Sequence, residues 1–202
     1  MGTEAQPRDW APLAPDEVKE LFVKLPIHWW IAGGWAIDLF LGRRTRPHGD
    51  TDVSIRRQDQ GIVQDYLSGW DLYKTHQPGL KPWPKGEFLG LGVNDIWCRR
   101  TPESPWCLQL VLLDASGDSW VFRRDPTITA PLGAIGRFTS SGIPFLAPEV
   151  QLLYKAKANT LEKDEADFQA VCPQLALEAR DWLRRCLNRR FPGGHPWLDR
   201  LR

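Results

Sequence analysis

The chain has 202 residues, a net charge of +1 and ordinary fractions of hydrophobic (42%) and charged (25%) residues. This length supports one sizeable core, or a core with a small appendage. The near-zero net charge excludes a global field that would attract nucleic acid or an acidic membrane, although it does not exclude a local basic patch. The apolar stretches are also too short to span a bilayer.

The four cysteines form no C-x-x-C pair, and the sequence shows no signal peptide. They are Cys98, Cys107, Cys172 and Cys186. This usage favours free thiols in a reducing compartment over a zinc site. We therefore expect a cytoplasmic protein.

The first part of the chain alternates predicted helices and strands. Residues 1–14 predict a frayed start, and apolar spacing predicts a helix from Pro15 until Pro26 stops it. The next predicted elements are a buried strand at 27–32, a helix at 35–41 capped by Gly42, a strand at 51–55 and a helix at 58–69.

Later segments complete the pattern. Short strands are expected at 70–73, 88–93 and 95–99, a loop at 77–87, the clearest strand at 106–113 and its hairpin partner at 119–125. Helices are expected at 149–159, 163–171 and 174–190. Strands and helices thus mix first and helices dominate last, which predicts an α+β fold with a helical subdomain at the C-terminus.

Two aspartates stand one residue apart at the start of a predicted strand, in the stretch GDTDVSI. Residues i and i+2 of a strand point to the same face, so Asp50 and Asp52 should approach one point. Two anions so placed repel each other unless a cation lies between them. Carboxylate oxygens at the end of a strand suit Mg²⁺, so Asp50 and Asp52 are the predicted metal ligands.

A glycine pair lies one short predicted helix before the aspartates. Gly33 and Gly34 let the backbone approach a ligand, and the following helix points N–H groups at a phosphate. Four basic residues between the two motifs can steer the same phosphates, namely Arg43, Arg44, Arg46 and His48. Either motif alone occurs often by chance, but their order and spacing are much more specific.

The string IAGGWAIDLFLGRRTRPHGDTDVSI resembles the nucleotidyltransferase superfamily with the polymerase-β-like palm. It is similar to the aminoglycoside 2''-adenylyltransferase-like and lincosamide nucleotidyltransferase-like branch. The segment at 144–168 resembles the helical region that follows the palm. The resemblance implies a palm domain at 1–147, formed by a mixed β-sheet flanked by helices, and a small helical subdomain at 148–202.

The same resemblance implies an enzyme that moves a nucleoside monophosphate onto a hydroxyl of a small molecule. ATP or another nucleoside triphosphate would be the co-substrate, with AMP the expected group, and Mg²⁺ the cofactor. An aminoglycoside or lincosamide antibiotic is the expected kind of acceptor.

The resemblance also implies roles for single residues. Gly33 and Gly34 would face the triphosphate, and Asp50 and Asp52 would hold one or two Mg²⁺ ions. The remaining expected nucleotide contacts are Arg46, His48, Gln109 and Lys155. For Lys155 a solvated helix lysine is an equally good interpretation, and a solvated acidic face is the better one for Asp164 and Asp167.

The resemblance also implies a third carboxylate on a later strand, which can act as a base toward the acceptor. The central polar residue of the matching strand is Gln109, which cannot take a proton at neutral pH. Asp114 is the nearest carboxylate and our candidate base, although in a regular strand it falls on the opposite face. Glu87, Asp95 and Glu103 are further candidates.

Two other functions compete with this one. The missing carboxylate favours a weak or inactive nucleotidyltransferase fold that binds or modifies a protein partner, as an antitoxin does. A tail-adding polymerase is disfavoured by the near-neutral charge. The acceptor pocket stays undetermined, since Trp83, Trp97 and Trp106 can line an apolar site and acidic residues of the second half can line a cationic one.

Overall fold

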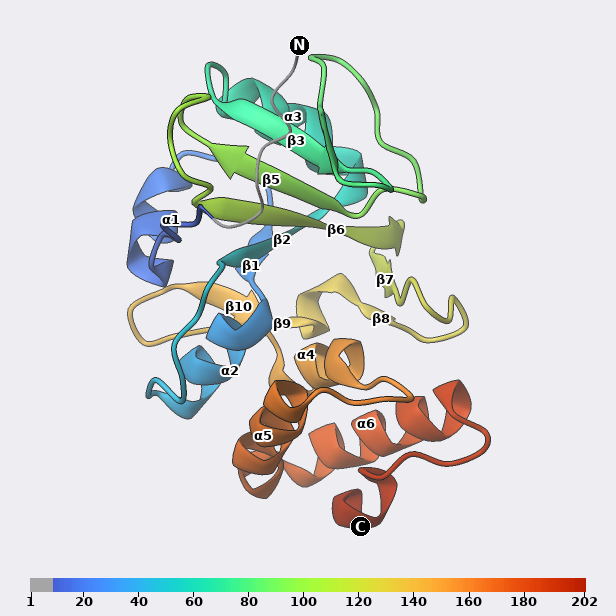
Figure 1. Cartoon of the computed structure of the whole chain (residues 1–202). Helices are drawn as coiled ribbons and strands as arrows, with labels where there is room; N and C mark the ends of the chain where they lie inside the picture. Colours follow the sequence, from blue (N-terminus) through green and yellow to red (C-terminus); the bar gives the residue numbers. More distant parts are fainter. Residues whose placement is uncertain (1–8) are drawn as a thin grey trace.

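The computed structural model describes residues 9–202 (Figure 1). Its helices are α1 (Pro15–Leu21), α2 (Gly33–Leu41), α3 (Gln60–Tyr66), α4 (Pro148–Lys155), α5 (Glu162–Val171) and α6 (Leu177–Arg190). The first five strands are β1 (Trp29–Ile31), β2 (Asp52–Arg56), β3 (Asp71–Thr75), β4 (Leu80–Pro82) and β5 (Asp95–Arg99). The others are β6 (Leu108–Ser116), β7 (Ser119–Val121), β8 (Thr129–Pro131), β9 (Gly136–Phe138) and β10 (Pro144–Leu146).

The strands form one mixed sheet in the order β4-β3-β5-β6-β2-β1-β10-β9. β7 extends the far end of β6, and β8 pairs with β7. β2 runs parallel to β6 and antiparallel to β1, so parallel and antiparallel pairs alternate at the centre. With helices packed against this sheet, the predicted α+β architecture is confirmed.

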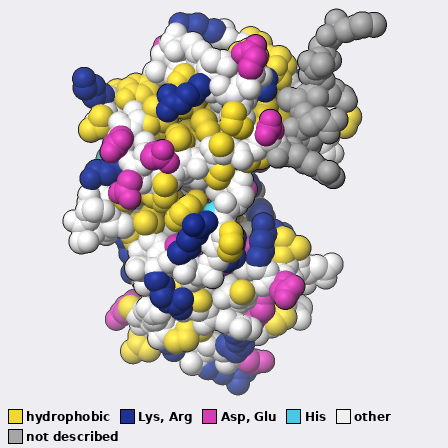
Figure 2. Space-filling view, turned by 60° about the vertical axis from the view of Figure 1, so that its left-hand side comes forward, with side chains coloured by type: hydrophobic (Ala, Val, Ile, Leu, Met, Phe, Trp, Pro, Cys, Tyr) yellow, Lys and Arg dark blue, Asp and Glu magenta, His cyan; other side chains and the backbone are white. Residues whose placement is uncertain are grey.

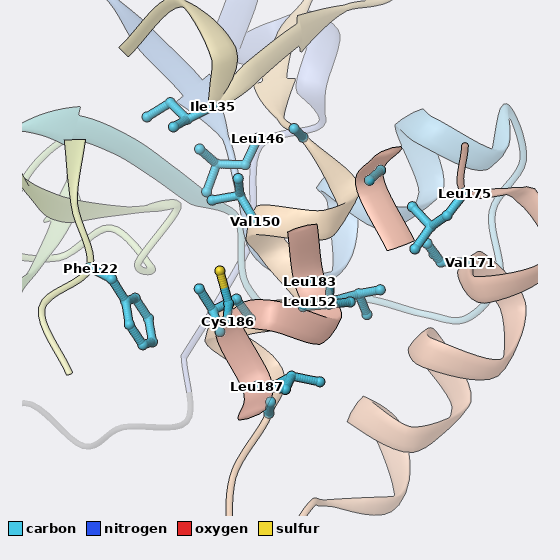
Figure 3. Close-up of a cluster of buried hydrophobic side chains, with 14 of the residues drawn as sticks. Phe122, Ile135, Leu146, Val150, Leu152, Val171, Leu175, Leu183, Cys186 and Leu187 are labelled. Carbon is cyan, nitrogen blue, oxygen red and sulfur yellow. The ribbon is translucent and has the colours of Figure 1, made fainter. Parts of the chain in front are cut away.

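Two buried hydrophobic clusters lie on opposite faces of the sheet. Trp30 belongs to one cluster, and its neighbours Trp29 and Ile31 belong to the other, as the alternation of side chains along a strand requires. The cluster of Trp30 also takes in side chains of α4 and α6 together with Ile135 and Leu146 (Figure 3). The C-terminal helices therefore share a core with the sheet. The domain boundary predicted at residue 148 coincides with the start of α4 and remains a prediction.

The segment before α1 is held against the sheet. Ala11 N–H donates to the carbonyl of Trp106 at 2.9 Å, and Leu13 N–H donates to that of Cys107 at 3.0 Å. The prediction of a frayed start is therefore wrong for residues 9–14, because these backbone groups find partners next to β6. Residues 1–8 lie outside the described part of the chain.

Some predicted elements change their bounds. Residues 88–93 form no strand, because the carbonyls of Leu89, Gly90 and Val93 accept hydrogen bonds from Arg57 instead of from a neighbouring strand. β4 lies inside the predicted loop at 77–87. The helix predicted at 149–159 ends at Lys155, since Ala156 has an extended backbone with ψ of 120°.

Two expectations concern the chain as a whole. All four cysteines are free, as the sequence predicts, and all four are buried. Within residues 9–202, no helix combines the length and the apolar character that crossing a membrane requires.

Candidate active site

A cleft opens over one face of the central strands, between the sheet and the C-terminal helices. Its lining residues are Ala32, Gly33, Asp52, Ser54, Asp95, Gln109, Val111, Leu113, Arg123, Arg124, Leu146, Gln151 and Tyr154. In the space-filling view the molecule narrows to a hollow at mid-height, with Lys and Arg side chains beside it (Figure 2).

The register of the sheet explains why distant residues meet in this cleft. Asp52 pairs with Gln109 across β2 and β6, and Asp95 pairs with Val111 across β6 and β5. Paired residues on neighbouring strands point to the same face. Asp52, Gln109 and Asp95 therefore project from three adjacent strands into one space.

Asp52 is the carboxylate of the cleft whose pKa is most strongly raised. Its pKa is raised from 3.8 to about 7, first by burial and then by the charges of Asp50 and Asp95, against the lowering effect of Lys155 and Lys163. Asp50 stands just before β2 and is exposed, so only Asp52 lies on the strand itself. The same-face argument for two residues of one strand therefore does not apply to Asp50, whose convergence with Asp52 remains a prediction, although the charges of both Asp50 and Asp95 act on Asp52.

At Gly33 and Gly34 the backbone passes very close to polar side chains. Gly33 has φ of 65°, and a Cβ atom there would lie 2.2 Å from Oδ2 of Asp52. A Cβ atom on Gly34 would lie 2.5 Å from both Arg46 and His48. The positive φ and the contact with Asp52 together require glycine at position 33, whereas a Cβ atom at position 34 would have to displace the side chains of Arg46 and His48.

The loop between α2 and β2 is organised by a residue that our motif analysis did not single out. Buried Asp38 accepts hydrogen bonds from the backbone and hydroxyl of Thr45 at 3.0 and 2.5 Å. Its other oxygen lies 2.5 Å from Nε2 of His48. His48 in turn contacts Arg46 at 3.3 Å and packs against Trp35, with ring centroids 4.5 Å apart. Arg46 and His48 are therefore fixed beside Gly34.

Lys155 lies in a buried ion network. Its Nζ atom is 3.0 Å from Asp164 and 2.7 Å from Asp167. Asp167 also pairs with Arg46 at 3.3 Å, which ties α5 to the loop before β2. The interpretation of these residues as solvated is wrong for all three, since Lys155, Asp164 and Asp167 are buried. Lys155 acts on Asp52 through its charge, while its own hydrogen bonds go to the two aspartates.

Asp114 does not reach the cleft. It lies on the opposite face of β6 from Gln109, and its Oδ1 accepts a hydrogen bond from Nε of Arg57 at 2.6 Å. The same guanidinium donates to the side chain of Asn94 at 2.8 Å, directly before Asp95. Asp114 is thus the counter-ion of an arginine that holds the 89–94 segment in place.

Asp95 is the second carboxylate that lines the cleft, beside Asp52. Burial raises its pKa, whereas the charge of Arg123 and a hydrogen bond from Gln109 lower it. Gln109 donates from Nε2 to Oδ1 of Asp95 at 3.2 Å. The sequence named Asp95 only as one of several candidates, because the register of β5 against β6 cannot be deduced from the residues alone.

The sequence did not identify several other residues of the cleft. Gln151 of α4 accepts a hydrogen bond from the N–H of Gly33 at 2.9 Å. Tyr154, also on α4, has a pKa raised to about 12 by burial. Arg123 and Arg124 lie one residue beyond the end of β7, and the sequence signal for them was an Arg-Arg pair at the end of a predicted hairpin strand. The cleft lining includes none of the three tryptophans considered for an acceptor pocket, Trp83, Trp97 and Trp106.

Comparison with known proteins agrees with this geometry. Residues 16–77, which carry both motifs, match the family model described as aminoglycoside-2''-adenylyltransferase. A lincosamide resistance protein of Staphylococcus haemolyticus is 21% identical over 154 residues, covering 75% of this chain and 88% of its own. The chain resembles the nucleotidyltransferase branch that its motifs predicted.

Solved structures give the same result for the fold. The lincomycin-bound lincosamide adenylyltransferase LnuA aligns with a TM-score of 0.52 at 18% identity, over 76% of this chain and 91% of its own. ANT(2'')-Ia in complex with adenylyl-2''-tobramycin aligns with a TM-score of 0.56 at 16% identity, over 86% and 95%. The fold is that of a nucleotidyltransferase. The nucleotidyltransferase family match and this fold together support the prediction that the chain is an enzyme of this class.

Proposed function

We propose that this nucleotidyltransferase-fold protein moves AMP from ATP to a hydroxyl of a small molecule, with Mg²⁺ as its cofactor. The observation that carries the proposal is Asp52, a carboxylate placed against the first residue of α2 with two further carboxylates acting on it. Within residues 9–202 no three His, Cys, Asp or Glu side chains converge as a ready-made metal site. Two carboxylates with water and phosphate oxygens are a sufficient set for Mg²⁺, so the residues fit the ion.

In this proposal Asp50 and Asp52 hold the metal. When bound, Mg²⁺ supplies positive charge that relieves the repulsion between the carboxylates and orients the triphosphate. The start of α2 offers backbone N–H groups to the phosphates, and Arg46 and Lys163 add positive charge on the same side. The expected cytoplasmic location agrees with ATP as the co-substrate.

We further propose that Asp95 takes the proton of the acceptor hydroxyl. The acceptor oxygen forms a bond to the α-phosphorus as the bond to the β-phosphate oxygen breaks, and pyrophosphate leaves. A carboxylate with a raised pKa is a better base near neutral pH than an ordinary one. Gln109 fixes Oδ1 of Asp95 and leaves its other oxygen for the acceptor.

Pyrophosphate release tests the proposal. The purified protein would receive each of the four ribonucleoside triphosphates with Mg²⁺ and a panel of lincosamides and aminoglycosides, with Asp52→Asn as the blank. We expect release that depends on one acceptor, prefers ATP and disappears in the blank. Release that persists unchanged in Asp52→Asn would refute the assigned site. The alternative of an antitoxin-like protein partner gains no support from the comparisons or from the described residues.

A further inference from the structure

The face of the sheet that carries the cleft continues past it onto β5 and β3. Gln109, the partner of Asp52, is also paired with Trp97 of β5. Trp97 is paired in turn with Tyr73 of β3. Paired residues on neighbouring strands point to the same face, so Trp97 lies on the cleft side of the sheet, beside Gln109 and two residues along β5 from Asp95. Two aromatic rings therefore border the end of the cleft that Asp95 and Gln109 line.

The C-terminal helices do not cover this part of the sheet. Among residues 9–202, the buried cluster that α4 and α6 share with the sheet contains no side chain of β3 or β5. These helices lie at the opposite end of the molecule from both strands (Figure 1). An open sheet face ordinarily carries polar side chains, so aromatic rings at the rim of a cleft indicate a binding surface. The cleft-side residues of the two strands are all half-buried, namely Asp71, Tyr73, Thr75, Asp95, Trp97 and Arg99.

Trp97 is held in place from two sides. Its ring centroid lies 5.0 Å from that of Trp10 and 5.7 Å from that of Trp106, in edge-to-face geometry in both cases. Trp106 is buried, and the guanidinium of Arg99 lies 4.4 Å from the centroid of its ring. Arg99 is itself fixed by Asp71 at 2.6 Å. A rigid, half-buried indole offers apolar surface to a ligand at little cost in conformational entropy.

The direction of the proposed reaction indicates which substrate reaches Trp97. In an in-line displacement the attacking oxygen and the leaving pyrophosphate lie on opposite sides of the α-phosphorus. The start of α2, where the phosphates are proposed to bind, follows β1 directly. In the strand order, β1 lies on one side of β2, and β6 and β5 lie on the other. With the pyrophosphate on the β1 side of Asp52, the acceptor hydroxyl arrives from the β5 side, where Asp95 and Trp97 lie.

We propose that Trp97 binds a pyranose ring of the acceptor, with Tyr73 extending the same surface. The inference rests on the proposed function and names the part of the acceptor that is recognised. The apolar C–H face of a pyranose packs on an indole, while the hydroxyl groups at its edge stay free to meet polar side chains. A protonated amino group on the sugar is attracted to the indole as well.

The spacing along β5 suits this arrangement. Asp95 and Trp97 are two residues apart on the same face, which is about 7 Å along a strand. One pyranose ring with its hydroxyl groups bridges that distance. A sugar stacked on Trp97 therefore presents a ring hydroxyl to the proposed base, and an amino-sugar antibiotic fits the surface.

Binding of lincomycin and of tobramycin to the full chain tests the inference. Isothermal titration calorimetry gives their affinities with and without Mg²⁺ and the non-hydrolysable analogue α,β-methylene-ATP, and it gives the affinity of the analogue separately. We expect at least one antibiotic to bind while the analogue is in place. Trp97→Leu keeps an apolar side chain and removes the ring, and it should weaken that antibiotic about five- to tenfold. Trp97→Phe should restore part of the affinity, and the analogue should bind equally to all three proteins.

Trp70→Leu is the matched control. Trp70 is also half-buried and has Arg100 5.0 Å over its ring, but it packs against the cluster on the opposite face of the sheet. Its replacement should leave the affinity for the antibiotic unchanged. A measurement on the wild type does not depend on the folding of any variant. Saturation of the aromatic protons of the protein in an NMR experiment should transfer most strongly to the pyranose protons of the bound antibiotic, and uniform transfer over the antibiotic would count against stacking.

The outcomes separate the inference from the proposed function. Unchanged antibiotic affinity in Trp97→Leu, or no binding of either antibiotic to the wild type, would overturn the inference while nucleotide binding stands. A loss of affinity for the analogue alone in Trp97→Leu would also overturn it, because Trp97 would then bind the adenine. Failure of the analogue to bind the wild type would count against the proposed function, and the titrations without nucleotide would still decide whether Trp97 binds the sugar.

Discussion

Replacing Asp52 with Asn should stabilise the fold while abolishing the metal site. The unfolded chain ionises Asp52 near pH 3.8, whereas the folded chain keeps the proton up to a pKa of about 7. Between these values the folded state binds more protons, so the contribution of Asp52 to stability falls as the pH rises from about 4 to about 7. Above pH 7 the folded chain carries the full free-energy cost of ionising the buried Asp52, and the uncharged amide of Asn avoids that cost.

The magnitude follows from the shift in pKa. Raising the pKa from 3.8 to about 7 corresponds to about 4 kcal/mol, at about 1.4 kcal/mol for each tenfold change in the ionisation constant. Because Asp52 partly faces the open cleft, solvent screening reduces this figure, and we expect about 2 kcal/mol. For a chain of this length that raises Tm by about 4–8 °C.

Thermal unfolding between pH 4 and pH 8, without Mg²⁺, measures this effect. Asp52→Asn should exceed the wild type at pH 8 and match it near pH 4, and added Mg²⁺ should stabilise only the wild type. Asp118→Asn is the matched control, since Asp118 is an exposed turn residue. A variant that is no more stable than the wild type at pH 8, or equally stabilised at both pH values, would refute the reasoning.

Four further variants test the structure. Asp95→Asn should lower kcat by about 100-fold or more with Mg-ATP binding intact. Asp114→Asn should instead lower Tm, since it leaves a buried arginine unpaired at a cost of about 3 kcal/mol. Steady-state kinetics and thermal melts on both variants show whether each residue acts in catalysis or in stability. Gly33→Ala places a Cβ atom 2.2 Å from Asp52 at a positive φ and should cost about 2 kcal/mol or more in urea unfolding, and a neutral result would show that the contact yields. Lys155→Met removes one of the two cations of each buried aspartate, while Asp167 keeps Arg46 and Asp164 keeps Lys157. It should cost about 3 kcal/mol, a loss that a chemical denaturation curve measures and that an unchanged midpoint would contradict.

The part of the site that the sequence predicts well is the part whose geometry is local. One short helix joins the Gly-Gly turn to the D-x-D strand, so their mutual placement depends on few backbone angles, and both motifs meet as expected. The fold class follows from the alternation of predicted elements in the same way. Asp38 was missed because a buried helix aspartate gives no sign of the loop residues that it binds.

The position of the third carboxylate could not be predicted from the residue pattern within a single strand. Gln109 and Asp114 both lie on β6, and no acidic residue of β6 faces the cleft. The neighbouring strand supplies Asp95 instead, through a register fixed by pairing between β5 and β6 and by Arg57, which holds the preceding segment. Such a register depends on contacts between residues far apart in the chain, and hydrophobic periodicity carries no information about it.

This relocation also accounts for Gln109. A carboxylate at that position would stand directly beside Asp52, since the two residues are paired across β2 and β6. An amide there avoids a further anion next to a carboxylate whose pKa is already raised, and its N–H group can still hold Asp95 in place. The proposed base, Asp95, lies one strand further from Asp52 than Gln109 does, and burial raises its pKa although the charge of Arg123 lowers it. The substitution that first argues against catalysis thus becomes a reason to expect the acceptor on the β5 side of the cleft.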